Sequence, residues 1–207
     1  MVRKKIKKTI KRWKRYHKIS GVGTITRRYF VMNAFDGALT MLGVIIGAGV
    51  AGQLDPKIII TAAIAGSIAM GASGMSGAYM TEKAERKKKL KKLEKAMLKD
   101  MSNTVHGKSH RFASFFAAIV DGVSPAIAAL FVVSPFFLSN FNIISSDIAF
   151  YSSIGLTLGL LTILGVYLAK ISDESMIRYG FQMLIVGLIT AFICIGTSIL
   201  LGGQIPA

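Results

Sequence analysis

The stretch YFVMNAFDGALTMLGVIIGAGVA, residues 29–51, decides the fold because it is an apolar run long enough to cross a bilayer. A single acid, Asp36, lies inside it. An ionised carboxylate at the centre of a bilayer costs about 2.5–3.5 kcal/mol on insertion scales, so it is retained where it faces a helix bundle, a wet cavity or a cation. Asp36 is therefore the first candidate for a functional residue.

The rest of the chain has the composition of a polytopic membrane protein. Of its 207 residues, 52% are hydrophobic and 17% are charged, and the mean hydropathy of +0.53 excludes an ordinary soluble domain. We expect an all-α fold of five transmembrane helices at about 29–51, 58–80, 112–138, 148–169 and 179–202. The second helix is expected to continue into the cytoplasm as a basic helix over residues 82–105, between a basic tail at 1–28 and a short external C-terminus at 203–207.

The positive charges are distributed unevenly along the chain, which has a net charge of +16. Twelve basic residues precede the first span, eleven lie between Lys83 and Arg111, and Lys57 stands in the loop between the first two spans. The positive-inside rule then places the N-terminus in the cytoplasm and the C-terminus outside, in what we expect to be the plasma membrane of a prokaryote. Cys194 is the one cysteine in the sequence, so an internal disulfide is excluded.

A second acid repeats the first. Asp121-Gly122 in the third span matches Asp36-Gly37, and both acids lie ~12–15 Å along their helices from the nearest flanking arginine. Pro125 has no N–H to donate to the carbonyl of Asp121. These features predict one cation site with two carboxylates whose titration is coupled. A proline kink with Asp121 hydrogen-bonded to a neighbour is the alternative.

The second span supplies thioethers at a depth similar to that of Asp36, so we expect carboxylate and thioether to be able to meet. Met75 lies seven residues before Glu82, and Met70 lies five residues before Met75. Both stand beside a ridge formed by Gly71, Gly74 and Gly77. A soft thioether next to a hard carboxylate suits a borderline ion such as Fe²⁺ better than Mg²⁺ or Ca²⁺.

The cytoplasmic extension adds further candidate ligands. Glu82 and Glu85 can share a helix face and bind a cation, although pairing with neighbouring lysines is the alternative. His106 and His110 lie four residues apart, but Gly107 between them makes a helical metal site doubtful.

Two segments carry a resemblance to a known family. FDGALTMLGVIIGAGVAG (35–52) and AGSIAMGASGMSGAYMTEKAE (65–85) resemble the first and second helices of the vacuolar iron transporter family, as in a short archaeal or bacterial member. The resemblance implies a dimer that exports Fe²⁺ or Mn²⁺ in exchange for protons, with Asp36 as the ion-binding aspartate and Met70 or Met75 as the methionine of the ion path. Ala78 stands where the family has a glutamate, and a lysine-rich segment replaces its glutamate-rich cytoplasmic helices.

The sequence features are compatible with two functions. The first is export of a divalent metal, with metal ions, protons, anionic lipids at the cytoplasmic face and a second copy of the chain as partners, and with no cofactor. The second is a membrane-anchored binding or scaffold protein that acts through its basic segments on anionic lipid or nucleic acid. The tail suits an anionic membrane surface because Ile6, Ile10, Trp13 and Tyr16 recur at nearly helical spacing among its basic residues. We do not expect an enzyme, because the five spans contain no nucleophile with a base, no phosphate loop and no histidine cluster.

The charge distribution gives a test of topology. In a Cys194→Ser background, a cysteine at position 147 should react with an impermeant thiol reagent added outside intact cells, and a cysteine at position 91 should react after the cells are opened. The opposite labelling pattern would overturn the proposed orientation.

Overall fold

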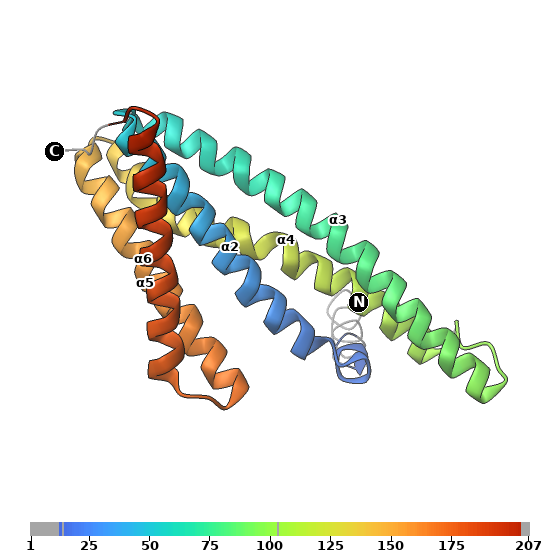
Figure 1. Ribbon diagram of the computed structural model, residues 1–207. Helices are drawn as coiled ribbons and strands as arrows, with labels where there is room; N and C mark the ends of the chain where they lie inside the picture. The colour runs from blue at the N-terminus through green and yellow to red at the C-terminus, as the bar shows by residue number, and fades with distance from the viewer. Residues whose placement is uncertain (1–12, 14, 103, 204–207) are drawn as a thin grey trace, which may run out of the picture. The chain divides into compact units, whose positions relative to one another are not determined.

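The computed structural model of the chain describes residues 13, 15–102 and 104–203. These residues form five long helices and contain no β-strand, and each helix is long and apolar enough to cross a membrane (Figure 1). The helices are α2 (Val22–Val50), α3 (Pro56–Met97), α4 (Val105–Asn140), α5 (Ser146–Ser172) and α6 (Met176–Leu200). The structure therefore confirms the all-α prediction of five potential membrane-spanning helices.

The start of α2, the end of α3 and the start of α4 differ from the predicted ends. The second span and the basic segment form one continuous helix of 42 residues, but α3 ends at Met97 rather than at residue 105. Leu98 adopts a left-handed backbone with φ of +50°, which terminates the helix. Helix α4 includes both His106 and His110, because a side chain at Gly107 would collide with the backbone of the preceding turn and glycine avoids that collision.

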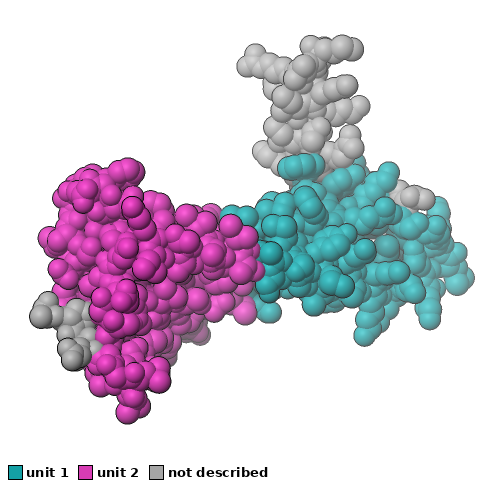
Figure 2. Space-filling view, turned by 90° about the horizontal axis from the view of Figure 1, so that it is seen from above, with its two compact units in different colours: residues 1–30, 71–123 teal, residues 31–70, 124–207 magenta. Residues whose placement is uncertain are grey.

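The chain divides into two compact units, which Figure 2 shows in different colours. The first unit comprises residues 1–30 and 71–123, and the second comprises residues 31–70 and 124–207.

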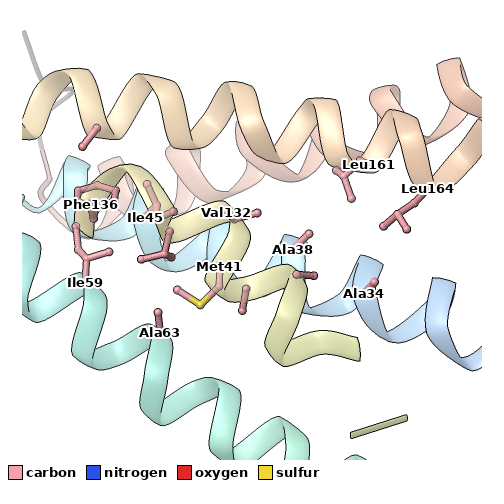
Figure 3. Close-up of a cluster of buried hydrophobic side chains, with 14 of the residues drawn as sticks. Ala34, Ala38, Met41, Ile45, Ile59, Ala63, Val132, Phe136, Leu161 and Leu164 are labelled. Carbon is pink, nitrogen blue, oxygen red and sulfur yellow. The ribbon is translucent and has the colours of Figure 1, made fainter. Parts of the chain in front are cut away.

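The second unit contains the larger hydrophobic core. Fully buried side chains from α2, α3, α4 and α5 meet there (Figure 3). They include Met41, Ile45, Ile59, Ala63, Val132, Phe136 and Leu161. Burial of a large aliphatic or aromatic side chain stabilises a fold in water by about 1.5–3 kcal/mol, but within a bilayer dispersion contacts between close-packed helices take over that role. Close packing explains why small alanines alternate with the large residues of this core.

Helices α5 and α6 form an antiparallel hairpin within the second unit. Their backbones approach closely at Gly165, where a Cβ would lie 2.6 Å from the carbonyl oxygen of Tyr179. Within α6, Gly180 and Gly187 are buried and both face side chains of α5, while most large apolar residues of α6 are exposed. An outward face of that kind is suited to lipid or to another protein chain.

In the first unit, the described part of the N-terminal segment packs against α4. Residues 15–20 are helical, and the rings of Trp13 and Tyr16 lie 5.7 Å and 6.0 Å from the ring of Phe112. Two of the apolar tail residues used in the prediction, Ile6 and Ile10, lie outside the described residues. Trp13 and Tyr16 thus make aromatic contacts with α4, which the prediction of a membrane-surface tail did not include.

Candidate metal-binding residues

Asp121 lies at a close crossing of α3 and α4 in the first unit. A Cβ built on Gly74 would lie 2.8 Å from Oδ2 of Asp121, and a Cβ on Gly122 would lie 2.6 Å from the carbonyl oxygen of Gly71. The two backbones can approach this closely because all three of these α3 and α4 positions are glycine. The Asp121 side chain is consequently 9% exposed and faces bare helix backbone rather than lipid.

Met75 belongs to the same crossing. Its own Cβ lies 3.0 Å from the position that a Cβ on Gly122 would occupy, and its side chain is 40% exposed. The structure therefore brings the Asp121 carboxylate and the Met75 side chain to one helix crossing. Of the predicted glycine ridge, Gly71 and Gly74 face α4, whereas a Cβ on Gly77 would have no neighbour within 4 Å among the described residues.

The other predicted methionine has different surroundings. Met70 belongs to the second unit, where it is half-buried and packs against the large hydrophobic core. Met75, which lies at the crossing that holds Asp121, is therefore the better candidate for a ligand.

Asp36 also belongs to the second unit, and its helix packs tightly there. At the next residue, Gly37, an added Cβ would lie 2.7 Å from Cα of Pro125, so α2 and α4 are in backbone contact. The Asp36 side chain itself is exposed in the single chain, on the same face as Met32. A carboxylate exposed on an apolar helix requires water, a cation or another chain to cover it.

Glu82 is the centre of a buried polar cluster in the first unit. Its side chain is buried and accepts a hydrogen bond from the Tyr29 hydroxyl at 3.1 Å on one carboxylate oxygen and from Nε of Arg86 at 2.9 Å on the other. Nη1 of Arg86 donates to the carbonyl oxygen of Ser20 at 3.3 Å. The cluster therefore joins α3 to the start of α2 and to the segment before it.

Glu85, by contrast, forms an exposed ion pair. Its carboxylate lies 2.7 Å from Nζ of Lys89, and both side chains are 59% exposed. Among the described residues, no three acidic, histidine or cysteine side chains are grouped as they would be in a preformed metal centre. A metal at Glu82 or Glu85 must therefore compete with the cation that each already holds.

Sequence comparison places these residues in a family. A sequence model of the VIT family matches residues 27–108 and 87–198, which include all the candidate ligands. An uncharacterized protein of Methanocaldococcus jannaschii is 37% identical over 171 residues, which are 81% of this chain and 85% of that protein. The chain belongs to the VIT family. Membership of VIT, a family of membrane metal-ion transporters, indicates a multi-pass transport protein rather than an enzyme.

Sequence reasoning on this VIT protein missed the partners of Glu82. The spacing of Glu82 and Arg86 is the usual one for an ion pair within a helix, and that signal was available. Tyr29 and Ser20 are 53 and 66 residues away from their partners, and their polar contacts have no local sequence signal.

The two ion pairs of α3 allow a matched test of stability. Glu82→Gln leaves the Arg86 guanidinium buried without an anion, so the unfolding free energy should fall by about 3–5 kcal/mol. Glu85→Gln removes the same charge from the same helix and should leave the thermal midpoint nearly unchanged, because the pair is exposed. Thermal unfolding of both detergent-purified variants would measure this, and equal midpoints would contradict the structural role of Glu82.

Proposed function

We propose that this VIT protein exports a divalent cation, Fe²⁺ or Mn²⁺, from the cytoplasm in exchange for protons, and that it works as a homodimer. The observation that carries the proposal is the placement of Asp121, buried in an apolar region against the glycines of α3 and beside Met75. Asp36 and Asp121 are the proposed metal ligands.

The chemistry of exchange follows from a carboxylate in a poorly solvated place. Burial disfavours the charged form of a carboxylate and so favours its protonation, whereas a nearby dication favours the ionised form. One side chain can therefore hold either a proton or part of the coordination shell of a metal ion. When the ion leaves, a proton from the opposite side can take its place.

The thioether gives the proposed site its selectivity. Hard ions such as Mg²⁺ and Ca²⁺ prefer all-oxygen surroundings, while a sulfur ligand favours softer transition ions. Met75 is suited to this role because its exposed side chain is free of the large core against which Met70 packs.

Two features support the dimer and the direction. The exposed carboxylate of Asp36 and the exposed apolar face of α6 both leave surface that a second copy can cover. The clustering of basic residues up to the first turns of α2, along the last part of α3 and at the start of α4 supports a cytoplasmic location for those segments, so a metal that leaves by the other side is exported.

Flux measurements in proteoliposomes test the proposal. Wild type should carry Mn²⁺ or Fe²⁺ into vesicles that contain a metal-sensitive dye. Asp36→Asn and Asp121→Asn should reduce this flux to the level of empty vesicles, because Asn keeps the shape of the side chain but cannot offer a negative charge.

Asp147→Asn provides the matched control, since it makes the same change in the first turn of α5 on an exposed side chain. Its flux should match that of wild type. Normal transport by correctly folded Asp36→Asn and Asp121→Asn would leave the two acids as structural residues. Absence of any metal flux in wild type would favour the membrane-anchored scaffold.

A further inference from the structure

A basic cavity lies in the first unit, apart from the carboxylate and thioether described above. It has a volume of about 460 Å³ and lies where the apolar parts of α3 and α4 give way to their charged parts. Its basic side chains are Lys83, Arg86 and Lys87 from α3 and His110 and Arg111 from α4. None of the described residues that line it is acidic.

Arg86 is fixed in place and has one polar group left over. The side chain is buried, with Nε held by Glu82 and Nη1 held by the carbonyl oxygen of Ser20. Nη2 is also buried and has no hydrogen-bond partner within the described part of the chain. A buried donor without a partner loses its hydration and gains nothing in return, so it is rare in folded proteins. Because Arg86 lines the cavity, an acceptor that entered there and reached Nη2 would remove this penalty.

His110, which also lines the cavity, has a second buried nitrogen, Nδ1, without a hydrogen-bond partner among the described residues. Around these two groups stand the exposed cations Lys83 and Lys87, with Nζ of Lys83 positioned 5.3 Å from the centre of the Tyr79 ring. The cavity thus combines a preorganised guanidinium, an imidazole and exposed ammonium groups.

We propose that this cavity binds a phosphate group, carried by the headgroup of an anionic phospholipid. Guanidinium and phosphate form strong charge-assisted hydrogen bonds, and a fixed Arg86 has already lost the side-chain freedom that binding would otherwise cost. A phosphate monoester offers acceptor oxygens and, when singly protonated, an O–H donor, so it can satisfy Nδ1 of His110 in either tautomer.

The position along the two helices favours a lipid as the source of the phosphate. The cavity begins at Tyr79, at the end of the apolar part of α3, and continues through the first charged turns. Headgroups of a bilayer occupy this zone, and basic residues there are attracted to anionic lipids. The site differs from the diffuse attraction of a basic tail because it has a defined cavity and a buried arginine.

Lipid binding to the full-length protein in a neutral detergent tests the proposal by native mass spectrometry. The probes are phosphatidic acid, phosphatidylcholine and inorganic phosphate. Phosphatidic acid should bind more tightly than phosphatidylcholine, and excess inorganic phosphate should displace it. Binding of inorganic phosphate without phosphatidic acid would support the phosphate site and reassign its source to a free anion.

A pair of double variants with equal charge locates the site. Lys83→Gln/Lys87→Gln removes two cavity cations without touching the Glu82–Arg86 pair, and should weaken phosphatidic acid binding by at least about tenfold. Lys91→Gln/Lys92→Gln removes two cations from α3 outside the cavity and should bind like wild type. Thermal unfolding of both variants verifies that they are folded.

Two results would overturn the proposal. One is equal weakening in both double variants, which would indicate general attraction to the basic chain. The other is a failure of phosphatidic acid to bind more tightly than phosphatidylcholine together with no binding of inorganic phosphate. A variant of Arg86 is avoided because it would also break the buried ion pair.

Discussion

A carboxylate placed inside an apolar helix is the constraint on which this account depends. Such a group is costly in hydrocarbon, and the cost falls only when polar surroundings or a cation are provided. Asp121 packs against helix α3, whose glycines let the backbones of α3 and α4 approach closely. A Cβ added to Gly74 would lie 2.8 Å from Oδ2 of Asp121. The glycines at this crossing therefore make possible the burial of Asp121 against α3.

Charge is handled differently at the basic end of the first unit. There Glu82 is buried, but it is held by Arg86 and Tyr29, which satisfy both of its oxygens. Glu82 is therefore poorly suited to exchange ions, because breaking its ion pair with Arg86 would leave a buried charge without a partner. Arg86 also lines a basic cavity, and its Nη2 has no hydrogen-bond partner among the described residues. The same chain therefore presents a carboxylate suited to metal in one place and a basic site suited to an anion in another.

The sequence predicted the five spans well because a bilayer requires long apolar helices, and length and hydropathy reveal them directly. It predicted the end of α3 less well. Leu90, Leu93, Met97 and Met101 keep helical spacing past the real end, but Leu98 turns left-handed and Asp100 forms a local turn. In that turn, hydrogen bonds from the backbone and hydroxyl of Ser102 lower the pKa of Asp100. Asp followed by Ser two residues later favours such a turn over a helix.

Contacts between residues far apart in the sequence were the other feature that the sequence did not predict. Periodicity identified Gly71, Gly74 and Gly77 as a ridge, but which of them meets α4 depends on how two helices cross, and Gly77 falls outside the contact. Asp36 and Asp121 were found as acids in apolar runs, which is a local signal. The presence of Met75 and Asp121 at one helix crossing and the hydrogen bond between Glu82 and Tyr29 depend on tertiary packing, which a single sequence does not reveal.

The central claim is that carboxylates within the apolar helices exchange a divalent metal for protons, and simultaneous measurement of both ions tests it most directly. Purified protein in vesicles carrying an internal pH-sensitive dye would be given an inward Mn²⁺ gradient, with a potassium ionophore clamping the membrane potential. The account predicts that the interior becomes more alkaline as Mn²⁺ enters, and that both movements are lost together in Asp121→Asn. Entry of Mn²⁺ with no change in internal pH would contradict it.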